Sequence, residues 1–126
     1  MKRALTVDEK KLNSYSIKNY QDKIKDLELS FKENKLILDE GIDIAFKEQI
    51  DIYNKLLKDN KPNTYNHKLS KIKIEVIKYN YPKQKQQYSN LINEILDKIK
   101  FSKEQIKILK DQIHNGIEIK ENKQVG

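Results

Sequence analysis

Hydrophobic positions recur with helical spacing along most of this chain of 126 residues. In the first long stretch the steps alternate between three and four residues, which is the a/d pattern of a narrow heptad seam. The seam consists of Ile17, Tyr20, Ile24, Leu27, Phe31, Asn34 and Leu38. Asn34 is its one polar member, of the kind that fixes register in a coiled coil. The pattern predicts a helix that pairs with a partner helix or a second copy, or an amphipathic helix that packs within its own chain.

Local signals predict where this helical region begins and ends. Thr6 and Glu9 have the spacing of a capping box, so the helix is expected to begin near Val7. Gly41 interrupts the pattern and fits either a turn or the interior of one long helix, where glycine costs about 1 kcal/mol. A second stripe follows and predicts a helix that ends before Pro62. Its members are Ile42, Phe46, Ile50, Tyr53 and Leu57.

The third element has two interpretations. Asn63 or Thr64 can cap a helix, and a stripe at helical spacing follows. The stripe consists of Tyr65, Leu69, Ile72, Val76 and Tyr79. Residues 72–76 also alternate with a period of two and are rich in β-branched side chains, which is typical of a strand. A helix is preferred because the flanking segments are helical, and a strand over Leu69–Tyr81 would make the fold α+β.

Two more helices are expected after Pro82. Proline ends a helix and is tolerated in the first turn of the next one. Ser102 and Gln105 have the spacing of a second capping box, which predicts a helix boundary there. The pair Asn115 and Gly116 is typical of a helix C-terminus.

Together these stripes predict an all-α fold. We expect a small elongated helical bundle, in which a long helix or helical hairpin over roughly residues 16–58 packs with three shorter helices. The chain is expected to form a single domain over residues 1–126. Within it, residues 1–62 form a coiled-coil-like half, residues 63–115 a basic helical half and residues 117–126 a flexible tail.

Positive charge is concentrated in one part of the sequence. Of the formal net charge of +7, six units lie in residues 63–103, and four of the seven tyrosines lie there too. Such a one-sided field favours an anionic partner, because lysines neutralise phosphates and exposed tyrosines stack on unpaired bases. Nucleic acid is the first candidate, and an acidic protein surface is the other. The expected contact residues are Lys71, Lys73, Lys78, Lys83, Lys85 and Tyr81.

The predominance of lysine over arginine favours considering alternatives to nucleic-acid binding. Lysine outnumbers arginine 25 to 1, which is typical of AT-rich coding in a low-GC bacterium, its phage or a plasmid. Nucleic-acid readers rely on arginine for bidentate contacts, so coding bias can explain part of the lysine excess. The alternatives are a protein–protein interaction module, such as a small inhibitor or adaptor of a mobile element, and a coiled-coil structural oligomer. A homodimer through the Ile17–Leu38 seam would suit either alternative.

Catalytic chemistry has few candidate residues. The chain has no cysteine, two histidines and no glycine-rich phosphate loop, so no enzyme, cofactor or metal site is expected. Asp39, Glu40 and Asp43 could hold a hard cation through oxygen ligands, but a solvated helix corner is the simpler explanation. The longest apolar runs are three residues, against about 20 for a membrane span. A cytoplasmic location in a bacterial host, without membrane contact, is therefore expected.

Overall fold

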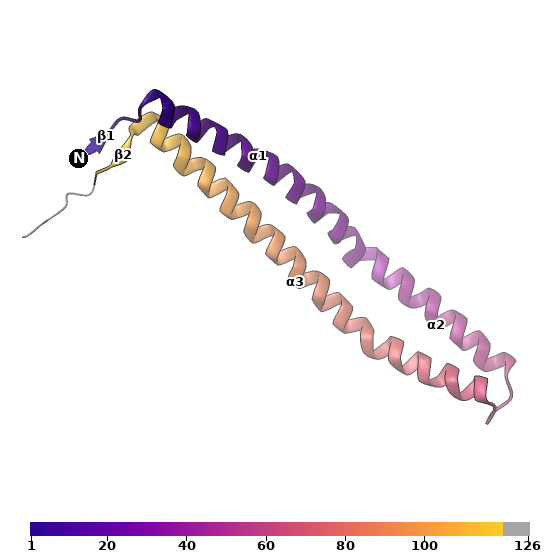
Figure 1. The fold of residues 1–126 in the computed structure, drawn as a ribbon. Helices are drawn as coiled ribbons and strands as arrows, with labels where there is room; N and C mark the ends of the chain where they lie inside the picture. Colours follow the sequence, from indigo (N-terminus) through magenta and orange to yellow (C-terminus); the bar gives the residue numbers. More distant parts are fainter. Residues whose placement is uncertain (120–126) are drawn as a thin grey trace, which may run out of the picture. The chain divides into compact units, whose positions relative to one another are not determined.

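The computed structural model describes residues 1–119, and this part of the chain is almost entirely helical (Figure 1). The helices are α1 (Val7–Leu36), α2 (Ile42–Asp59) and α3 (Tyr65–Asn115), and a π-helical turn, η1 (Ile37–Gly41), joins α1 to α2. The two strands are β1 (Lys2–Arg3) and β2 (Ile117–Glu118). The predicted all-α fold class is confirmed.

The chain divides into two compact units, and both α1 and α3 contribute residues to each. Unit 1 combines Met1–Leu29 with the segment from Ile95 onward, and unit 2 is Ser30–Glu94. In unit 1 the first part of α1 packs against the last part of α3. In unit 2 the end of α1, η1 and α2 pack against the first part of α3.

In unit 1 the two chain segments that flank the helices form a small antiparallel sheet. Lys2 pairs with Glu118, and Arg3 pairs with Ile117. Gly116 links α3 to β2 with a positive φ of 79°, a backbone conformation that favours glycine. The expected flexible tail is thus wrong for residues 117 and 118, which form β2, while residues 120–126 lie outside the described part of the chain.

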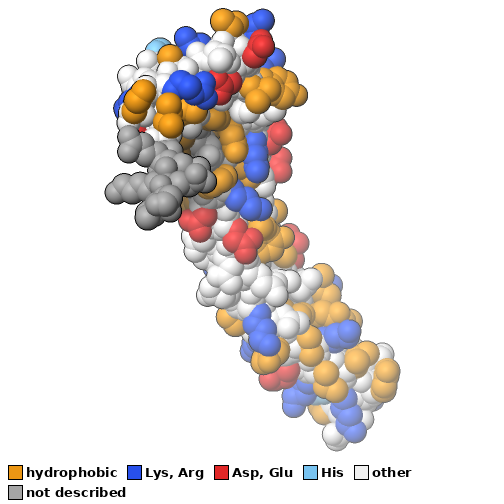
Figure 2. Space-filling model, turned by 60° about the vertical axis from the view of Figure 1, so that its left-hand side comes forward, with side chains coloured by type: hydrophobic (Ala, Val, Ile, Leu, Met, Phe, Trp, Pro, Cys, Tyr) orange, Lys and Arg blue, Asp and Glu red, His pale blue; other side chains and the backbone are white. Residues whose placement is uncertain are grey.

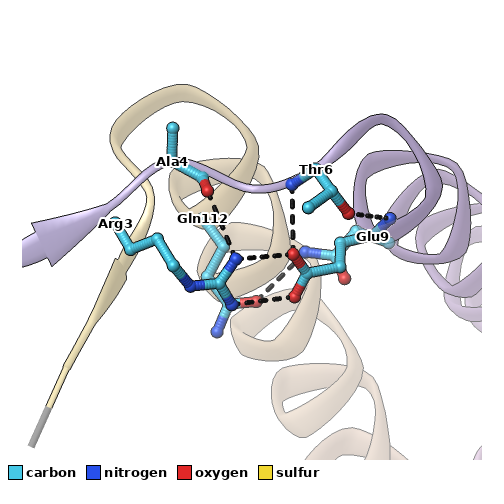
Figure 3. Close-up of polar contacts among 6 residues, drawn as sticks. Arg3, Ala4, Thr6, Glu9 and Gln112 are labelled. Atoms are coloured by element: carbon cyan, nitrogen blue, oxygen red, sulfur yellow. Dashed lines mark hydrogen bonds and ion pairs between the residues drawn. The ribbon is translucent and has the colours of Figure 1, made fainter.

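The predicted capping box at the start of α1 is confirmed, and Arg3 reinforces it (Figure 3). The Thr6 backbone N–H donates to Glu9 Oε1 at 3.0 Å, and the Glu9 backbone N–H donates to Thr6 Oγ1 at 3.2 Å. The Arg3 guanidinium donates to both carboxylate oxygens of Glu9, at 2.7 and 3.0 Å. This fork fixes the segment after β1 against the first turn of α1.

The stability of unit 1 should depend on the charge of Glu9. Hydrogen bonds from the Arg3 side chain and the Thr6 backbone lower the pKa of Glu9 from its ordinary 4.5 to about 2. A depressed folded-state pKa means that the ionised carboxylate stabilises the fold above about pH 4.5, and that this contribution is lost as the pH falls toward 2. The melting temperature of the wild type should therefore exceed that of Glu9→Gln at about pH 6, and the difference should vanish near pH 2.

Thermal unfolding followed by circular dichroism at the two pH values measures this difference. Glu28→Gln is the matched control, because Glu28 is an exposed carboxylate of α1 without an ion pair among the described residues. A gap between wild type and Glu9→Gln that stayed constant over the whole pH range would contradict the prediction.

The core is narrow in both units. In unit 1 the buried side chains are Leu5, Ile17, Ile95, Ile99 and Ser102, and in unit 2 they are Ile42, Ser70, Ile74 and Ile92. Most are isoleucines that recur along one stripe of a helix, so each unit is held by a single row of contacts between its helices.

The three short helices expected after Pro62 are in fact one continuous helix, α3. Pro82 lies inside it and removes one backbone hydrogen bond, yet Ile74 and Ile92 on either side of it are both buried. Ser102 is not an N-cap but a fully buried helix residue. Burial of this stripe outweighs the local breaking and capping signals, as tertiary contacts often do. The strand alternative for residues 69–81 is also wrong.

Gly41 lies inside a continuous helical segment rather than at a turn. The packed positions Asn34, Leu38, Ile42 and Phe46 are four residues apart, whereas an α-helix has about 3.6 residues per turn. A π turn contains one extra residue, and η1 supplies it at this point. The extra residue keeps Ile42, which is only 5% exposed, on the same packed face as Leu38.

Candidate interaction surface

The Ile17–Leu38 seam is covered within the chain itself. Ile17 is buried and the other six members are half-buried. The Asn34 side-chain amide donates to the Ser30 carbonyl oxygen at 2.8 Å, a contact within α1. Four residues before the seam, Asn13 donates to the Gln112 side-chain oxygen of α3 at 3.0 Å. Packing between helices of one chain therefore accounts for the burial of the seam.

Two of the predicted contact residues, Tyr81 and Lys85, belong to an internal polar cluster with Asp43. The Tyr81 hydroxyl donates to Asp43 Oδ1, and Lys85 Nζ lies 2.8 Å from the same oxygen. The Tyr81 ring packs on Phe46 of α2 with 4.2 Å between ring centroids. Hydrogen bonds from Lys85 and Tyr81 lower the pKa of Asp43, and the Asp43 carboxylate raises the pKa of Lys85. The cluster joins α3 to the first turn of α2 inside unit 2.

Lys83 contacts a tyrosine of its own helix. Its Nζ lies 4.0 Å from the centroid of the Tyr79 ring and donates to Tyr79 Oη at 2.7 Å. The two residues are four apart on α3, and Tyr79 remains 64% exposed. A cation beside an exposed ring of this kind is accessible to a partner.

The other three predicted lysines are exposed but do not share a face of α3. Lys71 and Lys78 are seven residues apart and therefore lie on one side of the helix. Lys73 lies elsewhere, in a groove that Ile52 of α2 and Val76 also line. The six predicted contact residues thus do not form one continuous surface.

An exposed apolar stripe runs along α3 in unit 2, and we call it the outer stripe. It consists of Tyr65, Leu69, Ile72, Val76 and Tyr79, with exposed fractions from 37% at Leu69 to 77% at Tyr65. An apolar stripe at helical spacing normally faces a core, but this one is exposed. The buried side of the helix carries Ser70 and Ile74 instead. Hydrophobicity alone would therefore have selected the wrong face, because the outer stripe is the more apolar of the two heptad-spaced stripes on α3.

Two exposed residues of α2 extend the outer stripe across unit 2. Ile52 is 58% exposed and Leu56 is 40% exposed. Ile52 lines a groove together with Val76 of the outer stripe, so the apolar surface continues from one helix to the other. We call the outer stripe with Ile52 and Leu56 the outer face. Figure 2 shows hydrophobic side chains interspersed with lysines on the surface near the α2–α3 turn, at the bottom of the view.

Two of the three acidic residues at η1 and the start of α2 are paired with lysines, and Glu40 is exposed. Asp39 forms an ion pair with Lys35 at 3.1 Å, and Asp43 forms the one with Lys85. Within residues 1–119, no group of three or more histidine, aspartate and glutamate side chains is placed to hold a metal ion. No helix in this range combines the length and the apolar character that crossing a bilayer requires.

Unit 2 thus has two distinctive groups of side chains, the outer face and the polar cluster around Asp43. The cluster uses its polar groups internally, whereas the outer face leaves apolar groups exposed. Comparisons of the chain with protein-family models, with curated proteins and with solved structures found no match.

Proposed function

We propose that this chain is a non-enzymatic protein–protein interaction module that binds through its outer face. The observation that carries the proposal is the exposure of the outer stripe, whose five apolar side chains are 37% to 77% exposed. Contiguous exposed apolar surface rimmed by polar residues marks interaction sites, because solvent exposure of such a patch is unfavourable without a partner.

The spacing of the outer stripe suits a helical partner. Its members follow one another at steps of four, three, four and three residues, which is a heptad pattern over about 21 Å of helix. Tyr65 and Tyr79 stand at the two ends and are the most exposed members. Tyrosine supplies a large apolar contact together with a polar hydroxyl, and it is enriched in the centres of protein interfaces.

Binding of a polyanion is the second candidate function. Lys71 and Lys78 favour it, since they are exposed on one side of α3 and have no ion pair among the described residues. Each can neutralise a phosphate. Tyr81 and Lys85 are used inside the chain, so the basic surface available to nucleic acid is smaller than the sequence suggested.

Two double variants on the same helix separate the candidates. Ile72→Glu/Val76→Glu disrupts the outer stripe, and Lys71→Glu/Lys78→Glu reverses the lysine row. All four side chains are exposed, so both variants should keep the helical circular dichroism of the wild type. Immobilised wild type and the lysine variant should retain the same protein from a bacterial lysate, while the stripe variant should retain it about tenfold less, because each 1.4 kcal/mol of lost contact is tenfold in affinity.

A labelled single-stranded DNA of about 30 bases tests the polyanion candidate with the same variants. DNA binding that weakens steeply with salt and is lost only in Lys71→Glu/Lys78→Glu would contradict the protein-interaction proposal. In that case the slope of the logarithm of DNA affinity against the logarithm of salt concentration should decrease in magnitude by roughly one for each lysine reversed. Equal retention of protein by the wild type and the stripe variant, together with no self-association of the wild type, would contradict the protein-interaction proposal as well.

A further inference from the structure

We infer that the outer face is covered by the outer face of a second copy of this chain, related to the first by a two-fold axis. In this pair α2 of each copy lies against α3 of the other, so that unit 2 of both chains forms a four-helix arrangement. The inference rests on the proposed function and names its partner. It moves the expected homodimer interface from the Ile17–Leu38 seam to the outer face.

The continuity of the exposed apolar surface is the first argument. The outer stripe extends over about 21 Å of α3, and Ile52 of α2 shares a groove with Val76 of the stripe. Interfaces of obligate homodimers are more apolar than the rest of the surface. The outer face therefore has the apolar character of such an interface.

The thin core of unit 2 is the second argument. Its buried apolar side chains are Ile42, Ile74 and Ile92, while seven large apolar residues of the outer face remain exposed. One helix packed on another buries a single stripe on each, and a stable domain normally needs a further layer against the remaining apolar stripe. A second α2–α3 pair supplies that layer.

Charge complementarity is the third argument, and it favours a second copy over an unrelated protein. Apart from Asp43 and Lys85, which pair with each other inside the chain, α2 carries three lysines and three carboxylates, and the part of α3 in unit 2 carries five lysines against two carboxylates, a net charge of +3. Pairing α2 with α3 of the other copy brings carboxylates of α2 to lysines of α3 twice, whereas pairing α3 with α3 would bring like charges together. A two-fold interface repeats each contact, so both sets of attractive contacts form within one dimer.

Specific residues can make these contacts. On α2, Glu48 and Asp59 lie at steps of four and three residues from Ile52 and Leu56 and thus flank the apolar pair. On α3, Lys73 and Lys83 lie beside the outer stripe. Glu48, Asp59 and Lys73 have no ion pair within residues 1–119. They are therefore available for pairs across the two-fold axis.

Sedimentation equilibrium of the full chain tests the inference. We expect the wild type at micromolar concentration to have twice the monomer mass of 15.0 kDa. Ile72→Glu should raise the dissociation constant about tenfold or more, because it places a charge in the apolar centre of the interface. Leu29→Glu is the matched control and should leave the dimer intact, since Leu29 of unit 1 is 60% exposed and Ile72 is 59% exposed.

A charge exchange tests the orientation of the pair. Glu48→Lys/Asp59→Lys and Lys73→Glu/Lys83→Glu should each weaken the dimer several-fold, and the chain that carries all four substitutions should regain most of the wild-type affinity. Such a rescue supports contacts between α2 of one copy and α3 of the other. A quadruple variant weaker than either double variant would overturn this arrangement.

The outcomes also distinguish this inference from the proposed function. A monomeric wild type that still captures a protein through the outer stripe would overturn the second copy as the partner and leave the proposed function in place. A dimer that Ile72→Glu does not weaken would overturn the outer face as the dimer interface. Loss of both self-association and stripe-dependent capture would overturn both.

Discussion

Replacement of Ile95 by Asp is expected to destabilise the protein by several kcal/mol, whereas the same replacement at the neighbouring Leu96 should have a small effect. Ile95 is 5% exposed and lies in the core of unit 1, while Leu96 is 44% exposed. A carboxylate at position 95 would be buried without a partner, which costs about 3 kcal/mol or more. This is a large fraction of the free energy of unfolding of a typical domain, which is about 5–15 kcal/mol.

Urea unfolding followed by circular dichroism measures both variants against the wild type. Ile95→Asp should lower the midpoint strongly or leave the chain unfolded at room temperature, and Leu96→Asp should shift the midpoint only slightly. Equal midpoints for the two variants would mean that the row of isoleucines on α3 is not the core of unit 1.

The second large effect is expected at Gly116. A Cβ there would lie 2.2 Å from the Arg3 carbonyl oxygen, and the backbone φ of 79° disfavours any side chain. Gly116→Ala should therefore cost about 1–3 kcal/mol, because either Arg3 or the end of α3 must move. The loss should appear as a lower unfolding midpoint and a lower melting temperature.

Gly41→Ala is the matched control, and it is expected to act in the opposite direction. Gly41 is helical, and the nearest atom to its added Cβ would be a side-chain atom of Ile37 at an ordinary 3.8 Å. Alanine there should raise stability by about 0.5–1 kcal/mol through helix propensity and a less flexible unfolded chain. Unchanged stability of Gly116→Ala would contradict the close approach of Arg3 to the end of α3.

Signals that depend on near neighbours in the sequence predicted the structure well. The capping box of Thr6 and Glu9 and the glycine at position 116 both mark helix ends in the structure. Such motifs are formed within a few residues, so the sequence contains all of their partners. Pro82 and Ser102 carry equally valid local signals, but burial of one continuous stripe of α3 overrides them.

The face of α3 that would be buried could not be predicted from hydrophobicity alone. Ile72 belongs to the more apolar stripe yet is 59% exposed, while Ser70 is 3% exposed. Which stripe is buried depends on where α2 lies, and this is fixed by contacts between distant residues. The Asp43–Tyr81 pair, 38 residues apart in sequence, is one such contact.

The candidate interaction surface could also be predicted only in part. The concentration of lysine in residues 63–103 was evident from the sequence, and helical periodicity already separates Lys73 from Lys71 and Lys78. The loss of Lys85 to Asp43 was not evident, because the two residues come from different helices. The exposure of the outer face follows only once the core is known.

The small sheet of unit 1 has a consequence for the order of folding. Asp43 and Tyr81 of unit 2 are 38 residues apart, Asn13 and Gln112 of unit 1 are 99 apart, and Met1 and Glu118 are 117 apart. The entropy lost on closing a loop increases with its length, so unit 2 should close first, starting near the α2–α3 turn. Unit 2 also leaves the ribosome before α3 is complete, so the outer face is formed before the C-terminal part of unit 1 has been synthesised.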